Sequence, residues 1–196
     1  MSVRKLLATA HRATPWKNGG GTTIEVAAYP EGAGIDAFVW RVSIARVDAP
    51  GPFSRFDGVD RSIAVVTGRG MSLAIDGRGA VRLEEGDPPF AFPGEVAVAA
   101  TLGAGSTEDF NVMTRRGRAA QRVTRVRVEG ERTFARAGAW LVLVVVRGYA
   151  VVTVDGRAEP LTPRDALLID DDRPFTLRSG DASLFVVDLW SLGDGR

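Results

Sequence analysis

The residue types that most often carry catalysis are scarce in this chain. Its 196 residues include a single histidine, His11, and no cysteine. Zinc, iron, nickel and copper sites generally draw on imidazole or thiolate ligands, so one chain cannot build such a site here. Nucleophilic triads are nearly excluded too, because His11 is the only imidazole base and there is no thiol. We therefore expect no transition-metal centre and no cofactor.

An oxygen-ligated magnesium or calcium site stays open, and its sole candidate is the run Asp170, Asp171 and Asp172. Adjacent aspartates on a strand or turn point in different directions, and their spacing does not match a calcium-binding loop. We interpret the run as a solvated turn and expect no metal site.

The most unusual stretch is PWKNGGGTT, residues 15–23. Three consecutive glycines allow positive φ angles and a close approach of the backbone to a neighbour or ligand. Trp16 offers an apolar wall with one N–H donor, while Asn18, Thr22 and Thr23 supply neutral donors and acceptors. A phosphate-binding loop needs its lysine after the glycines and a helix behind it, whereas these glycines lead into a strand. The stretch is therefore either a ligand-binding loop or a structural turn.

Two arginines stand where a charged side chain needs a partner. Arg41 lies in the alternating strand FVWRVSI, on the same face as Ser43 and opposite Trp40. Burial of a lone charge costs several kcal/mol, on the order of a protein's whole stability, so Arg41 either forms a salt bridge or binds an anion. Arg61 follows the loop GPFSRFDGVD and lies at the entrance of a buried strand. Guanidinium groups suit planar carboxylates, which they hold through two parallel hydrogen bonds.

A third polar set lies in the strand EDFNVM, where Asp109, Asn111 and Met113 share one face. We expect this face to point into a cup, because Arg41 and Arg61 need partners and Asp109 can serve one. A carboxylate held by two arginines has a lowered pKa and makes a poor base near neutral pH.

The elements that must position these residues read as strands. Apolar, β-branched stretches of four to eight residues alternate with the 23 glycines and 10 prolines, which is typical of an all-β sandwich or barrel. The clearest stretches are Ile24–Ala28, Phe38–Ala45, Ile63–Val66, Met71–Ile75, Val96–Thr101, Phe110–Met113, Leu141–Val146, Val151–Val154, Ala166–Ile169, Phe175–Leu177 and Ser183–Leu189. No stretch keeps a 3.6-residue apolar period, so we expect little helix.

The chain also repeats itself. The segment Val65–Asp87 resembles Val145–Asp165, with matched glycines, Asp-Gly turns and closing aspartates at offsets of 80, 79 and 78 residues. Asp-Gly between alternating strands predicts a hairpin with a type I′ turn. Hairpins with glycine corners are similar to the cupin jelly roll, and two copies suggest a bicupin, with one cupin-like barrel over residues 1–115 and a second over 116–196. The alternative is that two unrelated hairpins share common turn chemistry.

Between the copies lies the basic segment Arg115–Arg132. It either docks an anionic partner or forms an exposed connecting strand with Val123, Val126 and Val128 partly buried. We favour the strand, because the net charge of the chain is only +1. That balance also argues against nucleic-acid binding. The longest apolar run, Ala139–Val146, is too short to span a bilayer, and the N-terminus lacks a secretory pattern, so we expect a cytoplasmic protein without membrane contact.

Four of these segments, PWKNGGGTT, FVWRVSIARV, GPFSRFDGVDR and DFNVMTRR, resemble the signature blocks of the HutD/Ves family in order and spacing. The resemblance implies a cytoplasmic bacterial bicupin without an established catalytic activity. One branch of the family is associated with histidine utilisation and another with stress or cold response. It also implies a pocket for a small acidic metabolite in the N-terminal barrel, formed by Trp16, Asn18, Thr22, Arg41, Ser43, Arg61, Asp109 and Asn111.

Three functions follow from these observations. The first is a non-catalytic binding or regulatory protein for a small carboxylate of the urocanate or formylglutamate type. The second is a cofactor-free isomerase or hydrolase acting on a similar metabolite, with Asp109, Glu25 or Tyr29 as proton carrier. The third is a structural or protein-interaction role linked to stress. A homodimer is compatible with all three.

Overall fold

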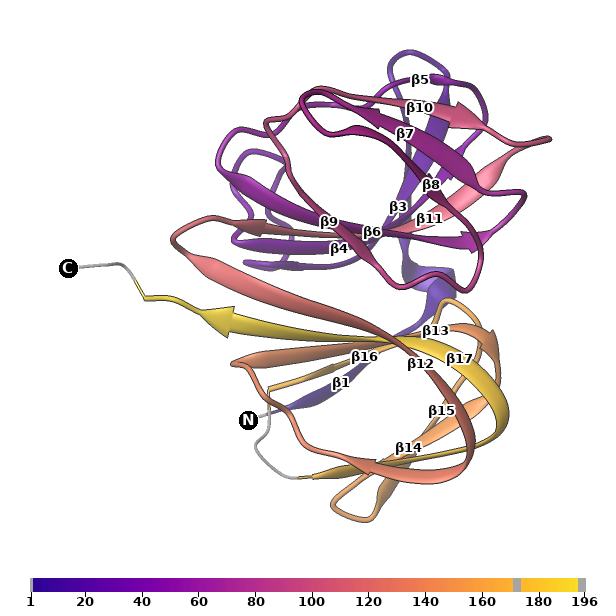
Figure 1. Ribbon diagram of the computed structural model, residues 1–196. Coiled ribbons are helices and arrows are strands. Elements are labelled where there is room, and N and C mark those ends of the chain that lie inside the picture. Colours follow the sequence, from indigo (N-terminus) through magenta and orange to yellow (C-terminus); the bar gives the residue numbers. More distant parts are fainter. Residues whose placement is uncertain (1, 171–173, 194–196) are drawn as a thin grey trace. The chain divides into compact units, whose positions relative to one another are not determined.

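The fold is built almost entirely from β-strands. The computed structural model describes residues 2–170 and 174–193, and within them a single 3-10 turn, Ala8–Ala10, interrupts the strands (Figure 1). The expected low helix content is confirmed for these residues. No helix in this described part of the chain has the length and apolar character needed to cross a membrane. Two of the three aspartates expected to form a turn, Asp171 and Asp172, lie outside the described residues.

The chain divides into two compact units. One is Arg12–Arg118, and the other combines the segment up to His11 with the segment from Ala119 onward. The unit Arg12–Arg118 holds two antiparallel sheets, one with strand order β2-β3-β4-β11-β6-β9 and one with order β5-β10-β7-β8. Its strands are β2 Arg12–Pro15, β3 Gly21–Tyr29, β4 Trp40–Val47, β5 Gly51–Pro52, β6 Val59–Thr67, β7 Met71–Ile75, β8 Gly79–Leu83, β9 Phe90–Pro93, β10 Val98–Leu102 and β11 Thr107–Arg115.

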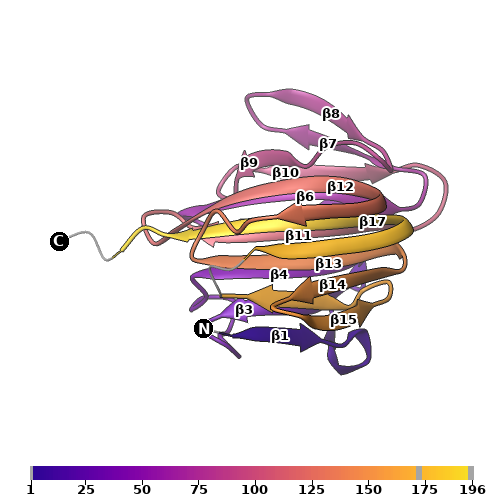
Figure 2. The same ribbon diagram turned by 90° about the horizontal axis from the view of Figure 1, so that it is seen from below.

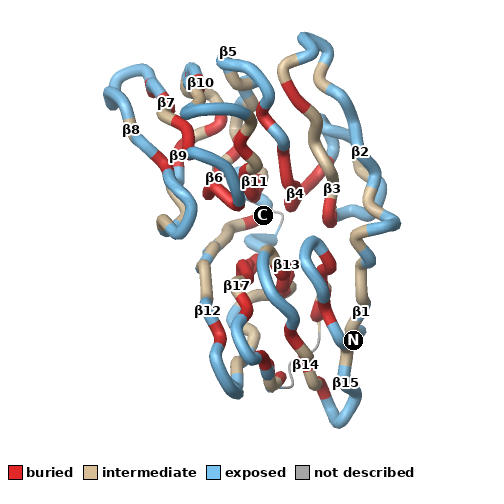
Figure 3. Tube along the Cα trace, turned by 90° about the vertical axis from the view of Figure 1, so that its right-hand side faces the viewer, coloured by how far each residue is buried: buried red, intermediate tan, exposed pale blue. Residues whose placement is uncertain are grey.

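Both sheets of this unit contribute to one apolar core. Val47, Ile63 and Val65 come from the six-stranded sheet, and Leu73 and Val98 come from the four-stranded sheet. Figure 3 shows how buried and exposed segments alternate along these strands. Because successive side chains of a strand face opposite sides, the residues in register with Val47, Ile63 and Val65 define one face of the six-stranded sheet. We call it the inner face, and it carries the candidate site.

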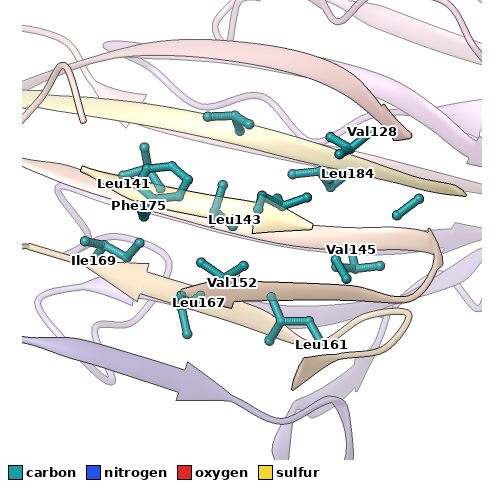
Figure 4. Close-up of a cluster of buried hydrophobic side chains, with 14 of the residues drawn as sticks. Val128, Leu141, Leu143, Val145, Val152, Leu161, Leu167, Ile169, Phe175 and Leu184 are labelled. Atoms are coloured by element: carbon teal, nitrogen blue, oxygen red, sulfur yellow. The ribbon is translucent and has the colours of Figure 1, made fainter. Parts of the chain in front are cut away.

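The second unit is a single antiparallel sheet of order β1-β16-β13-β17-β14-β15, with β12 paired to β17. Figure 2 shows the long strands β12 and β17 side by side. Leu141, Leu143, Leu167 and Phe175 are among the side chains at its apolar core (Figure 4). Its strands are β1 Val3–Leu6, β12 Ala119–Phe134, β13 Trp140–Gly148, β14 Ala150–Val154, β15 Arg157–Leu161, β16 Ala166–Ile169 and β17 Phe175–Ser191.

The N-terminal strand departs from the expected division of the chain. We placed residues 1–115 in one barrel, yet β1 pairs antiparallel with β16, with Val3 opposite Ile169 and Leu6 opposite Ala166. The backbone amide of Ala8 also donates to the carboxylate of Asp165 at 2.9 Å. These long-range contacts assign the segment up to His11 to the unit formed mainly by the C-terminal half.

The internal repeat has a structural counterpart in both units. In each copy an aspartate closes the second hairpin: Asp87 accepts from the amide of Glu84 at 2.8 Å, and Asp165 accepts from the amide of Thr162 at 3.0 Å. The Asp-Gly turn of the second copy has φ of 50° at Asp155 and 77° at Gly156, as a type I′ turn requires. The first copy has a three-residue loop between β7 and β8, which accounts for one residue of the drift in offset.

Two glycines in the second copy of the repeat, Gly148 and Gly156, give a stability prediction. A Cβ atom on Gly148 would lie 2.1 Å from the carbonyl oxygen of Asp181, and the residue has φ of 80°. Gly156 has nearly the same φ, 77°, but open space around its Cβ position. We expect Gly148→Ala to lower the free energy of unfolding by about 3 kcal/mol or more, and Gly156→Ala by only about 1 kcal/mol, in urea titrations. Equal losses would contradict the assigned close approach.

The basic segment between the repeats is largely a strand. Most of it lies in β12, whose partner throughout is β17 (Figures 1 and 2). Val123 and Val126 are partly buried as expected, whereas Val128 is completely buried. The side chains of Arg122 and Arg127 are exposed and form ion pairs with Asp188 and Asp181.

Candidate ligand-binding site

The strand register brings the predicted polar residues of three strands to the inner face. Asn111 of β11 lies directly between Ser43 of β4 and Ile63 of β6. Met113 lies between Arg41 and Arg61, one step further along the same face. Asp109 occupies the preceding step, between Ala45 and Val65. The expectation that the polar face of β11 points inward agrees with this register, because Ile63 and Val65 belong to the core.

Arg61 is the most unusual of these residues. Only 6% of its surface is exposed, and its guanidinium carbon lies 5.5, 5.5 and 5.0 Å from the ring centres of Phe53, Phe56 and Phe92. One amino group contacts the carbonyl oxygen of Ser54 at 3.4 Å, and the buried Nε has no hydrogen-bond partner. Burial lowers the pKa of Arg61 to about 10, and the charge of Asp109 opposes that shift. The side chain remains cationic near neutral pH.

Asp109 is buried, and within the described part of the chain no ion pair matches its charge. It is 2% exposed, and its Oδ1 atom has no hydrogen-bond partner. Burial raises the pKa of Asp109 to about 7; the charge of Arg61 acts to lower it and that of Glu108 to raise it. Our expectation of a lowered pKa was wrong, because desolvation of this carboxylate outweighs the attraction of the nearby guanidinium. Asp109 therefore changes its protonation state in the physiological range.

Asn111 adds a third buried atom without a partner, its Oδ1, and the residue is 8% exposed. Buried polar atoms are nearly always hydrogen-bonded, and each exception costs about 1–3 kcal/mol. Three such exceptions lie close together, on adjacent strands of one sheet face, in Arg61, Asp109 and Asn111. Together they reduce the stability of the folded protein. A ligand or an ordered water at this face would remove this loss of stability.

Arg41 has a different partner from the one expected. Its Nε donates to Oε2 of Glu25 on β3 at 2.7 Å, so Glu25 rather than Asp109 balances its charge. The two side chains are 15% and 33% exposed, which places the pair nearer to solvent than Arg61. Sequence reasoning treated Glu25 only as a possible proton carrier.

The glycine-rich stretch forms a tight turn beside this sheet. The indole Nε1 of Trp16 donates to Oγ1 of Thr23 at 2.8 Å, and the ring packs against the core of the unit. Gly21 is needed for this packing, because a Cβ atom would lie 2.2 Å from the carbonyl oxygen of Arg46 and 3.1 Å from the Trp16 ring. The donor of Trp16 is thus already used within the protein.

Two predicted site residues lie apart from the cluster. Asn18 is exposed, and its Oδ1 accepts from the amide of Gly20 at 3.0 Å, which is a local turn contact. Thr22 lies opposite Arg46, whereas its neighbour Thr23 lies opposite Ala45, on the side of Asp109. Alternation therefore turns Thr22 away from the inner face.

Sequence reasoning also missed the aromatic surroundings of Arg61. Phe53 and Phe56 belong to the loop GPFSRFDG, which was noted for its turn residues, and Phe92 lies directly opposite Arg61 on β9. Two phenylalanines three residues apart, shortly before a buried arginine, are a signal that could have suggested this arrangement. Among the described residues no group of three or more histidine, aspartate or glutamate side chains is arranged to hold a metal ion.

The inner face therefore combines a few polar groups with an apolar lining. It presents one cationic donor without a partner for Nε, one titratable carboxylate and one amide oxygen, surrounded by apolar side chains. Ligand sites in proteins commonly combine an apolar lining with a few convergent polar groups.

Comparison with known proteins identifies the family. The HutD family model matches residues 8–186. An uncharacterised 21.2 kDa protein in the hutC 3′ region of Pseudomonas putida is 46% identical over 50% of this chain, and the match spans only about half, 51%, of that relative. Protein Ves of Citrobacter koseri is 36% identical over 72% of this chain and 67% of its own length.

Solved structures agree with the sequence match. HutD from Pseudomonas fluorescens SBW25 superposes with a TM-score of 0.84 at 30% identity, covering 98% of this chain and 100% of that one. Salicylate 1,2-dioxygenase from Pseudoaminobacter salicylatoxidans, at 12% identity and a TM-score of 0.59 over 76% of this chain and 71% of its own, shares the fold alone. The all-β, cupin-like class expected from the hairpins is confirmed. With a family model matching most of its length, the chain belongs to the HutD family.

Proposed function

We propose that this protein binds a small carboxylate metabolite without converting it, and that the binding site is the inner face around Arg61. We further propose that each unit is a cupin-like barrel and that the site belongs to the N-terminal one. The single observation that carries the proposal is the buried guanidinium of Arg61, which among residues 2–170 and 174–193 has no carboxylate partner and no hydrogen-bond partner for its Nε donor.

A buried arginine has lost the water molecules that would otherwise stabilise its charge. Taking a charge out of water costs several kcal/mol, on the order of 5, even after local relaxation, and three aromatic rings return only about 0.5–2 kcal/mol each. A ligand carboxylate would add two charge-assisted hydrogen bonds in a region from which water is largely excluded. Phe53 and Phe56 belong to the loop between β5 and β6, and each ring centre lies 5.5 Å from the guanidinium carbon of Arg61.

The choice of metabolite rests on the relatives. The Pseudomonas putida relative is described by its position in the hutC 3′ region, and the Pseudomonas fluorescens relative is named HutD. These names support a role linked to histidine utilisation, in which urocanate and formylglutamate are the carboxylates we expect the site to accept.

Isothermal titration calorimetry tests the proposal. We expect urocanate or formylglutamate to bind to the native chain, and Arg61→Ala to weaken that binding by about 100-fold, because a buried charge pair loses one partner. Arg55→Ala is the matched control, since Arg55 lies in the loop that carries Phe53 and Phe56, is exposed and donates to the carbonyl oxygen of Glu95. Absence of heat with both ligands and with glutamate, or equal affinity of native and Arg61→Ala chains, would refute it.

One observation favours a second candidate, a cofactor-free enzyme. A carboxylate whose pKa lies at about 7 is well matched to general acid–base catalysis, and Asp109 meets that condition. Conversion of a bound metabolite by the native chain, lost on Asp109→Asn while binding is retained, would support catalysis over simple binding.

A further inference from the structure

We infer that the ligand of the inner face must carry an N–H donor as well as a carboxylate, with the carboxylate on Arg61 and the donor on Asp109. This inference rests on the proposed function and narrows its ligand class from small carboxylates in general to amide-, imidazole- or amidine-bearing ones.

Three buried atoms of the inner face have no hydrogen-bond partner among the described residues. Arg61 Nε can only donate, whereas Asp109 Oδ1, when ionised, can only accept, and Asn111 Oδ1 accepts as well. The amide of Asn111 also has an Nδ2 group that donates, so Asn111 can meet either an acceptor or a donor of a ligand. A complementary ligand therefore needs one acceptor for Arg61 and at least one donor for Asp109. A ligand built only from carboxylates would satisfy Arg61 but would leave the Asp109 carboxylate without a donor and place negative charge beside it.

The hydroxyl of Ser43, opposite Asn111, can either donate or accept and so fits both kinds of ligand. The other charged groups on this face do not remove the requirement set by Asp109. Arg41 and Glu25 are bonded to each other at 2.7 Å, so their charges are mutually balanced. Glu108 is the sequence neighbour of Asp109, and its side chain is turned to the other face of β11. The four-stranded sheet contributes apolar core side chains, among them Met71, Leu73 and Ile75. Arg61 is thus the charged group from a neighbouring strand that acts most directly on Asp109.

The two ligand classes should exchange protons in opposite directions. N–H donors bonded to Asp109 stabilise its ionised form, so binding of such a ligand expels the proton that Asp109 partly retains near pH 7. A ligand without donors is accepted only when Asp109 is protonated and can itself donate, so its binding takes up a proton. The sign of proton linkage therefore reports which chemistry the site selects.

Formylglutamate and glutarate form a suitable pair of probes. Both have a five-carbon dicarboxylate chain, and only formylglutamate has an amide N–H. Urocanate is less suitable here, because an imidazole itself titrates near 6.5, within about one unit of Asp109. Calorimetry of the full chain at pH 7 in PIPES and in Tris, whose ionisation enthalpies differ, measures the number of protons exchanged with each probe.

We expect formylglutamate to release protons, to bind at least tenfold more tightly than glutarate at pH 8, and to gain affinity between pH 6 and pH 8. We expect glutarate to take up protons and to lose affinity over the same range. Asp109→Asn should abolish the buffer dependence for both probes, and the measurement on the native chain stands even if that variant fails to fold.

The outcomes separate this inference from the proposed function. Arg61-dependent binding of both probes with the same sign of proton exchange, or of glutarate alone, overturns the donor requirement and leaves carboxylate binding intact. Buffer-dependent heat that persists in a folded Asp109→Asn variant also overturns it, because the proton would then come from another group. Failure of formylglutamate to bind while urocanate binds through Arg61 overturns this inference and leaves carboxylate binding intact. Failure of urocanate, glutamate and both probes to bind overturns both proposals.

Discussion

Replacing Arg61 by methionine should make the unliganded protein more stable and abolish carboxylate binding. The guanidinium is 6% exposed, and no carboxylate in the described residues forms an ion pair with it. Methionine has a similar length and makes favourable contacts with the rings of Phe53, Phe56 and Phe92. Removing the desolvated charge should outweigh the lost cation–π contacts, and we expect a gain of about 1–3 kcal/mol in the free energy of unfolding.

Urea denaturation of the native and Arg61→Met chains, without ligand, measures this gain. The matched control is Arg55→Met, an exposed position where we expect a change within about 0.5 kcal/mol. Saturating ligand should then stabilise the native chain and leave Arg61→Met unchanged, since ligand that binds only the folded state adds stability by mass action. A destabilised Arg61→Met variant would indicate that Arg61 is a structural residue, not a binding residue.

We expect Arg61 to lower the stability of the unliganded protein and to be required for ligand binding. This contrast is the main reason to treat the inner face as functional. Natural proteins retain locally unfavourable groups where function requires them and are rarely at their stability optimum. Arg61, Asp109 and Asn111 each break the rule that buried polar atoms have partners, and they do so on neighbouring strands. His11 and Thr114 also have buried polar atoms without a partner among the described residues. The inner face differs from these positions because a cationic donor, a carboxylate and an amide lie together on it.

Most of the strand content could be predicted from the sequence because its signals are local. The predicted stretches Met71–Ile75 and Ala166–Ile169 coincide with β7 and β16, and the Asp155-Gly156 turn has the expected conformation. The two stretches Phe175–Leu177 and Ser183–Leu189, by contrast, belong to one long strand, β17, which pairs with β14 at one end and β13 at the other. Gly180 lies between the two predicted stretches, where we expected a turn. The strand continues through it because these pairings outweigh the local preference of glycine for turns.

The sequence predicts on which face of its strand each site residue lies. It does not predict which residue each side chain bonds to. Alternation alone places Arg41, Ser43, Asp109 and Asn111 on consistent sides of their strands, and pairing then sets them on one face. The salt bridge between Arg41 and Glu25 depends on β3 lying beside β4, and no local pattern encodes that. The pKa of Asp109 depends on how deeply the finished fold buries it, because charge counting alone gave the wrong direction.

Burial of Asp109 leads to the second large prediction, a loss of stability as pH rises. Its pKa is about 7 in the folded protein, against about 3.9 for an aspartate in an unfolded chain. Between about pH 4 and pH 7 the folded state therefore retains a proton that the unfolded state has released. Stability from this group is fully present below pH 4, declines by at most about 1.4 kcal/mol per pH unit, and is lost above pH 7.

Asparagine at position 109 removes this decline, because it keeps the shape and polarity of the protonated carboxyl group and cannot ionise. The difference in unfolding free energy between Asp109→Asn and the native chain should be near zero at pH 4.5 and should grow to roughly 2–4 kcal/mol in favour of the variant at pH 8. Comparing two chains cancels the opposite trend from groups such as Glu95, whose hydrogen bonds to Arg116 lower its pKa.

Urea titrations at pH 4.5, 6 and 8 are sufficient for this comparison, with Asp57→Asn as the control. Asp57 is exposed in the loop before β6, so its replacement should give the same small difference at all three pH values. A difference for Asp109→Asn that stays constant with pH would mean that Asp109 ionises in the folded chain as readily as in the unfolded one. The carboxylate would then be solvated or paired, and proton-coupled ligand binding at the inner face would lose its physical basis.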